Sequence, residues 1–173
     1  KDAVLLERLF MFLAGNIGSY FSVNKIVNHL KSAKIHTNHE TISNYISFLC
    51  ESYIVHETER YDIKGKSIIS GNKKYFLNDL SFRNYLLSSY SFALGREIEN
   101  IFYINLRSEG YTVYSGLSNN NSEVDFIAEN KNEKIYYQIT YSMNEKKTYD
   151  REYRSLSSIK DNFQKYIISM DDI

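Results

Sequence analysis

The chain has 173 residues, of which 43% are hydrophobic, and its formal net charge is zero. This favours one large or two small soluble domains, and the single cysteine, Cys50, excludes an internal disulfide while no Cys/His spacing indicates zinc. No segment approaches the roughly 20 apolar residues of a membrane helix and no signal-peptide pattern opens the chain, so we expect a cytoplasmic protein without a membrane partner.

Residues 1–90 are predicted to form three helices and a hairpin. In chain order we expect a helix over residues 4–13, a second over 23–30, a third that begins after residue 38, and strands over 54–61 and 73–77. Ser22 and Asn38 are suitable N-caps for the second and third helices. Only residues 31–37 separate these two helices, as a helix-turn-helix requires. Three helices followed by a hairpin is the winged-helix order.

The hairpin is the more basic feature of this predicted winged helix. The outer face of the third helix offers no Lys or Arg to read base edges. The hairpin has five cations, which are the candidate nucleic-acid-binding residues: Arg60, Lys64, Lys66, Lys73 and Lys74. Such cations contact phosphates without reading sequence. A solvated hairpin on a packing module is an equally good interpretation.

Residues 91–173 are predicted to form a second domain. A polar run over residues 88–91 interrupts the apolar periodicity, and the balance of Lys+Arg over Asp+Glu changes there from 11 − 8 = +3 to 10 − 13 = −3. The expected elements are a helix over residues 92–109, strands over 112–115, 123–129 and 134–141, a helix that Thr148 caps and that reaches about residue 162, and a strand over 166–170. We expect the first helix to bury Leu94, Ile98, Ile101, Phe102 and Leu106. The order is αβββαβ.

Two acids in this second domain stand out as candidate site residues. Asp125 lies in the middle of an apolar strand, where a carboxylate is costly to bury unless it meets a cation or hydrogen-bond donors. Glu99 falls beside the apolar stripe of the preceding helix. Gln138 and Thr140 are two residues apart on the next strand, so they share one face.

This arrangement resembles the restriction-endonuclease-like core of PD-(D/E)xK nucleases. The resemblance implies that Glu99 and Asp125 stand at metal-binding positions, with Gln138 and Thr140 where such a nuclease has a third acid and a lysine. Two carboxylates would hold Mg²⁺ while the lysine positions the attacking water. The negative charge of the third acid and the positive charge of the lysine are both missing here, because Gln138 is neutral and Thr140 cannot replace an ammonium. We therefore expect a degenerate site.

The chain also resembles, over nearly its whole length, a domain of unknown function at the C-terminus of prokaryotic AAA+ ATPases. Short motifs support this resemblance: the segments 95–100, 109–114, 123–126, 137–141, 151–152 and 161–171, and in the first domain 60–62 and 73–79. The resemblance implies a P-loop ATPase domain before Lys1 in the intact protein, so that this chain would be a fragment.

The sequence thus favours an α+β protein: a winged-helix domain over residues 1–90 and a restriction-endonuclease-like domain over 91–173. We expect a catalytically degenerate, ATPase-linked module that binds DNA or a partner and needs no cofactor. One alternative is a weak Mg²⁺-dependent nuclease that uses Glu99 and Asp125, with Lys146 or Lys147 in place of the missing lysine. Another is a protein-interaction module that binds no nucleic acid; near-zero net charge argues against strong DNA affinity.

Overall fold

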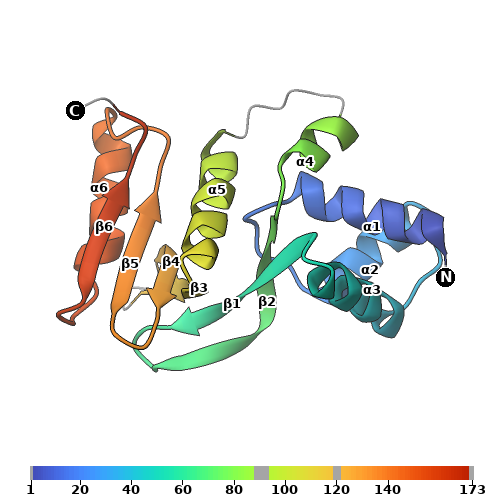
Figure 1. Cartoon of the computed structure of the whole chain (residues 1–173), viewed down its shortest axis with the longest axis horizontal. Coiled ribbons are helices and arrows are strands. Elements are labelled where there is room, and N and C mark those ends of the chain that lie inside the picture. Colours follow the sequence, from blue (N-terminus) through green and yellow to red (C-terminus); the bar gives the residue numbers. More distant parts are fainter. Residues whose placement is uncertain (1, 88–93, 119–121, 172–173) are drawn as a thin grey trace. The chain divides into compact units, whose positions relative to one another are not determined.

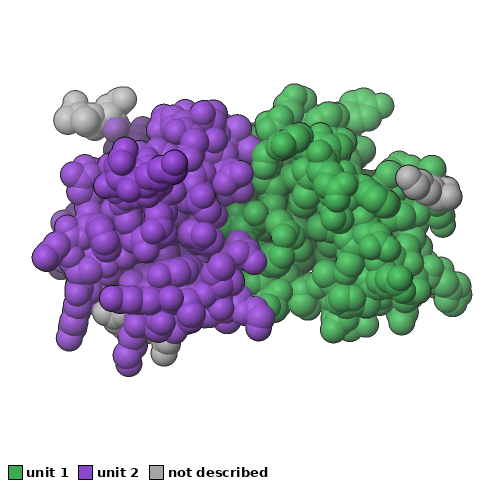
Figure 2. Space-filling view, turned by 60° about the horizontal axis from the view of Figure 1, so that its bottom comes forward, with its two compact units in different colours: residues 1–58, 71–92 green, residues 59–70, 93–173 purple. Residues whose placement is uncertain are grey.

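The computed structural model describes residues 2–87, 94–118 and 122–171 (Figure 1). It divides the chain into unit 1, residues 1–58 and 71–92, and unit 2, residues 59–70 and 93–173 (Figure 2). The predicted α+β class is confirmed. The polar run expected to mark the domain boundary, residues 88–91, and the predicted loop tip at 119–121 lie outside the described residues. Within the described residues, no helix combines the length and apolar character that crossing a membrane requires.

Unit 1 contains the three predicted helices and the inner part of the hairpin, residues 55–58 and 71–77. Its elements are α1 (Ala3–Gly15), α2 (Val23–Ser32), α3 (His39–Glu51), β1 (Val55–Asp62), β2 (Ser67–Leu77) and α4 (Ser81–Leu86). The predicted caps are present: Ser22 Oγ accepts from the Lys25 amide at 3.3 Å, and Asn38 Oδ1 accepts from the Thr41 amide at 2.9 Å. β2 begins six residues earlier than predicted, and α4 was not predicted.

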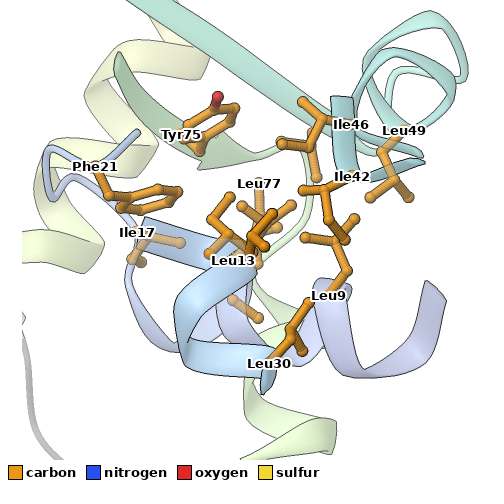
Figure 3. Close-up of a cluster of buried hydrophobic side chains, with 14 of the residues drawn as sticks. Leu9, Leu13, Ile17, Phe21, Leu30, Ile42, Ile46, Leu49, Tyr75 and Leu77 are labelled. Carbon is orange, nitrogen blue, oxygen red and sulfur yellow. The ribbon is translucent and has the colours of Figure 1, made fainter. Parts of the chain in front are cut away.

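The core of unit 1 lies between its helices and the inner part of β2 (Figure 3). Leu9 and Leu13 of α1 are fully buried among residues from α2, α3 and β2. Phe21, between α1 and α2, stacks on Tyr75 with ring centroids 4.9 Å apart. Phe21 also exchanges two backbone hydrogen bonds of 3.1 Å with Lys73 of β2. The segment before α2 is thereby tied to the hairpin as a short third strand.

Cys50 on α3 is half-buried against this core, and its thiol should react slowly. Burial, with a smaller contribution from the Glu57 carboxylate, raises the pKa of Cys50 from 9.0 to about 11. At pH 8 the fraction of thiolate is then about 100-fold smaller than for a thiol with the ordinary pKa. A more basic thiolate is also about tenfold more nucleophilic, so the rate of reaction falls by about tenfold overall. We expect DTNB to label the native chain at least about tenfold more slowly than the urea-unfolded chain. Equal rates would contradict this protection.

Unit 2 is built on a mixed sheet. Its elements are the outer parts of β1 and β2, then α5 (Leu94–Ser108), β3 (Thr112–Leu117), β4 (Glu123–Glu129), β5 (Lys134–Ile139), α6 (Lys146–Ser157) and β6 (Gln164–Ile168). The strand order is β2-β1-β3-β4-β5-β6. β3 pairs antiparallel with β4 and β4 with β5, whereas β1 with β3 and β5 with β6 are parallel. The predicted αβββαβ order of this half is present.

The two helices of unit 2 cover opposite faces of the sheet. On α5, Phe102 and Tyr103 contact Phe126 of β4, with ring centroids 6.4 and 5.8 Å apart. On α6, Leu156 clusters instead with Ile127 and with side chains of the neighbouring strands. Consecutive strand residues point to opposite faces, so Phe126 and Ile127 face different helices. Figure 1 shows α6 alongside β5 and β6.

The tip of the hairpin belongs to the sheet of unit 2. Arg60, Tyr61 and Asp62 of β1 pair with Ser115, Gly116 and Leu117 of β3. Beyond the strand, the Ile63 amide donates to the Leu117 carbonyl at 3.0 Å. The Ile63 side chain is 7% exposed and packs in the same cluster as Leu156. The tip therefore contributes both a strand and a core side chain to unit 2.

Two helical predictions in unit 2 need correction. α5 buries Asn100, Tyr103 and Leu106, whereas Leu94 and Ile101, which we expected to be buried, are 38% and 60% exposed. The helix is rotated because two aromatic side chains, Phe102 and Tyr103, meet the sheet. α6 begins at Lys146 and not after Thr148, and its N-cap, Glu145, makes no side-chain cap hydrogen bond.

Candidate functional site

Asp125 and Gln138 lie side by side on β4 and β5. The register of these strands pairs Phe126 with Tyr137, so the next residues along each strand are Asp125 and Gln138. Their side chains bond the opposite backbone: Asp125 Oδ2 accepts from the Ile139 amide at 2.7 Å, and Gln138 Oε1 accepts from the Asp125 amide at 3.3 Å. Side chains thus replace the regular ladder of backbone bonds at this point.

A β-bulge places Asp125 at this position. Between the pairs Tyr114–Ile127 and Gly116–Val124, β3 has the single residue Ser115 whereas β4 has two, Asp125 and Phe126. Bulges bend a strand and redirect a side chain, and they are frequent beside functional sites. Ser115 is fully buried, and its hydroxyl donates to the Glu59 carbonyl of β1 at 3.2 Å.

Thr140 lies just beyond the end of β5. Its amide donates to the Ile168 carbonyl of β6 at 3.0 Å, and its hydroxyl donates to the Ser142 carbonyl at 3.3 Å. The side chain is 8% exposed. The chain therefore continues to pair with β6 beyond the end of β5. On the β4 side, the neighbouring Ile139 amide donates to Asp125 Oδ2. Thr140 therefore presents a buried hydroxyl where the nuclease resemblance implies an ammonium.

Glu99 is half-buried on α5, the helix that covers the Phe126 face of the sheet. The adjacent Asn100 is 1% exposed, a buried polar residue that the sequence did not single out. Among the described residues, no three His, Cys, Asp or Glu side chains gather in a group able to hold a metal ion. Within the predicted constellation, a hydrogen bond joins Asp125 and Gln138.

Asp171 holds the segment that follows Thr140. Its Oδ2 accepts from the Met143 amide at 2.6 Å and its Oδ1 from the Asn144 side chain at 2.9 Å. The backbone hydrogen bond from Met143 is the main reason that the pKa of Asp171 lies below its ordinary value. From the sequence, Asp171 was recognised only as the end of the resemblance segment 161–171. Its hydrogen bonds to residues 143 and 144 depend on the tertiary structure, because Met143 and Asp171 are 28 positions apart in the chain.

The predicted nucleic-acid-binding cations of the hairpin differ in accessibility. Lys64 and Lys66 are exposed at the turn, and Arg60 is half-buried on β1. Lys73 forms an ion pair with Glu57 at 2.6 Å. Lys74 is only 2% exposed, with Nζ 5.2 Å from the ring centroid of Tyr20. Lys64 and Lys66 are thus the two members of the set that this conformation presents to a phosphate.

Buried polar side chains on α6 were not found from the sequence. Glu152 is 3% exposed, and its Oε1 accepts from Arg151 Nε at 2.9 Å and also from Arg151 Nη2. Ser155, also 3% exposed, donates to the Glu123 carbonyl of β4. A polar residue in an amphipathic helix usually faces solvent, so periodicity offered no signal for these contacts.

Two relatives align with nearly the whole chain. An "Uncharacterized protein" of Haemophilus influenzae is 33% identical over 169 residues, 98% of this chain and 41% of that protein. "Uncharacterized protein MJ1544" of Methanocaldococcus jannaschii is 28% identical over 181 residues, 99% of this chain and 39% of that protein. The chain spans about two fifths of the length of these relatives. No solved structure matches it significantly.

A family model also matches the first half of the chain. It describes a domain of unknown function, DUF8612, and it covers residues 1–91. This range takes in all three helices that precede the hairpin, both hairpin strands and α4. Because the match covers more than half of the 173 residues, the chain belongs to the DUF8612 family.

Proposed function

We propose that the chain is a nucleic-acid-binding part of a longer, ATPase-linked protein, with a winged-helix unit and a restriction-endonuclease-like unit that does not cleave. The observation on which the proposed lack of cleavage rests is the pair of hydrogen bonds between Asp125 and Gln138 and the opposite backbone. Gln138 commits its carbonyl oxygen to an amide and brings no negative charge. Mg²⁺ sites rely on carboxylates, and this pair supplies one.

The architecture of each unit supports the two fold assignments. In unit 1, α1, α2 and α3 precede the hairpin, and the Phe21–Lys73 bridge adds the short strand that a winged helix has between its first two helices. In unit 2, the αβββαβ order places an acid at a bulge on the second strand of the β3-β4-β5 meander. An altered strand at such a point is frequent beside functional sites.

The proposed binding is weak and independent of sequence. The exposed outer face of α3 includes Glu40, Asn44 and Ser47 but no Lys or Arg, whereas Lys64 and Lys66 are exposed at the hairpin turn. Contacts to phosphates provide affinity without sequence information, and such affinity falls steeply with salt. The link to an ATPase is supported by the length of the relatives, since more than half of each lies outside the matched part and leaves room for a further domain.

A cleavage experiment tests the degenerate site. We expect the 173-residue chain to leave supercoiled plasmid DNA intact with Mg²⁺ or Mn²⁺. Gln138→Glu together with Thr140→Lys restores the missing carboxylate and ammonium, and a glutamate can still accept from the Asp125 amide. The added charge lies beside Asp125, so Mn²⁺ should raise the Tm of this variant and bind in calorimetry. Adding Asp125→Ala should abolish both effects.

Gln164→Glu is the matched control, because it adds the same charge at an exposed position of β6. It should gain no response to Mn²⁺. Robust cleavage by the unmodified chain that Asp125→Ala removes would overturn the degenerate site. It would favour instead a weak nuclease based on Glu99 and Asp125, with Lys146 or Lys147 supplying the ammonium.

A further inference from the structure

The outer face of α6 has a fixed orientation. The helix buries Glu152, Ser155 and Leu156 against the sheet, and the Ser155 hydroxyl bonds the Glu123 carbonyl of β4. The buried side therefore determines which residues point to solvent. The exposed residues of the helix are Lys146, Lys147, Tyr149, Asp150, Arg151, Tyr153, Arg154 and Ser157. Tyrosines, charged groups and one serine make up this face, and it contains no aliphatic side chain.

Two tyrosines on this face form a parallel pair. Tyr149 and Tyr153 are one helical turn apart, with ring centroids 6.0 Å apart and ring planes inclined by 6°. They are 48% and 57% exposed, so each ring keeps much of its surface in water. Exposed rings that are already parallel can stack with further flat rings at little cost in side-chain entropy.

The segment that contains the tyrosine pair has an excess of cations. Residues 145–160 contain five Lys and Arg against three Asp and Glu, 5 − 3 = +2, in a chain whose net charge is zero. One of those acids, Glu152, is buried and bonded to Arg151. Within the part of the chain that the structure describes, Lys146, Lys147 and Arg154 take part in no ion pair. These cations remain available to an anionic ligand.

We propose that the outer face of α6 binds single-stranded nucleic acid. Bases stack on Tyr149 and Tyr153, while Lys146, Lys147 and Arg154 contact phosphates. This inference deepens the proposed nucleic-acid-binding function and rests on it. Aromatic platforms flanked by cations are how proteins bind single strands without reading sequence. In a duplex the bases stack on one another and cannot meet the tyrosines, so the proposed ligand is a single strand.

Fluorescence anisotropy at low salt tests the proposal. The probes are a fluorescein-labelled oligothymidylate of about 15 nucleotides and a mixed-sequence duplex of the same length. Tyr149→Leu with Tyr153→Leu should weaken oligothymidylate binding by at least about tenfold, since the two lost stacks together cost that much or more. Tyr149→Phe with Tyr153→Phe keeps the stacking faces and should retain binding. Far-UV circular dichroism checks that each variant is folded.

A lysine variant tests the contribution of the cations, and a tyrosine variant in unit 1 serves as a control. Lys146→Gln with Lys147→Gln should reduce the slope of log K against log salt by about 1.4, at roughly 0.7 per phosphate contact on a single strand. Tyr85→Leu is the matched control, because Tyr85 is an 87% exposed helical tyrosine in unit 1. It should leave binding unchanged.

The outcomes distinguish this inference from the proposed function. Unchanged binding by the folded leucine variant would overturn the α6 site. If only the duplex binds, and Lys64→Ala with Lys66→Ala weakens it, the α6 site falls while nucleic-acid binding stands. If neither probe binds, both fall and a protein-interaction module is favoured. Loss of binding with leucine, retained with phenylalanine, would establish the stacking site.

Discussion

Leu13→Ala should lower the free energy of unfolding by about 3–5 kcal/mol, the cost of emptying a buried leucine site. Leu13 is 0% exposed and packs among residues of α2, α3 and β2 (Figure 3). Its neighbours belong to several elements, so they cannot collapse into the cavity without moving a helix. Urea unfolding followed by circular dichroism at 222 nm gives the free energy.

The matched control for this change is Leu6→Ala on the same helix. Leu6 is 38% exposed, so its truncation removes less buried surface and leaves no enclosed cavity. We expect a loss of about 1 kcal/mol or less. Equal losses at the two positions would mean that α1 does not present Leu13 to the core.

Gly116→Ala should be the most damaging small substitution in unit 2, with an expected loss of about 3 kcal/mol. A Cβ at Gly116 would lie 2.9 Å from the Val124 Cβ and 3.1 Å from the Ile127 Cδ1. Val124 and Ile127 are both 0% exposed, and the Val124 Cβ is attached directly to the backbone of β4. Relief therefore requires a shift of the strand that contains the bulge at Asp125 and Phe126.

Gly95→Ala provides the comparison for Gly116. Gly95 is near the start of α5, and a Cβ there would have no neighbour within 4 Å. Alanine should be neutral there or stabilise the helix by up to about 1 kcal/mol. Thermal and urea unfolding measure both variants. A Gly116→Ala chain as stable as the parent would show that the strands do not approach closely at the bulge.

Much of the local structure follows from the sequence. Caps and periodicity are short-range signals, so Ser22 and Asn38 correctly predicted the starts of two helices. The αβββαβ order of the second half and the mixed α+β class were predicted as well. Asp125 was identified because an acid in an apolar strand needs donors, and the Ile139 amide is one such donor. The roles proposed for Glu99, Asp125 and Gln138 stay predictions.

Other features depend on contacts between distant residues. The sequence placed Arg60 and Lys74 together on one basic hairpin, but β1 pairs with β3 some 55 residues further along, and Lys74 turns inward to Tyr20. The bulge on β4 cannot be predicted from the local sequence, because it is defined by pairing across strands: Asp125 and Phe126 lie opposite the single residue Ser115 of β3. The rotation of α5, which exposes Ile101 and buries Asn100, depends on how aromatic rings fit the sheet.

The sequence by itself therefore determined the α+β class, the order of most elements and the caps of α2 and α3, since these depend on residues within one or two helical turns. The tertiary structure alone decided which strands become neighbours, which polar groups are buried and where Asp125 and Gln138 meet. The reason is physical: a helix cap or a period is stabilised by nearby atoms, whereas strand pairing and burial depend on closing long loops around a shared core.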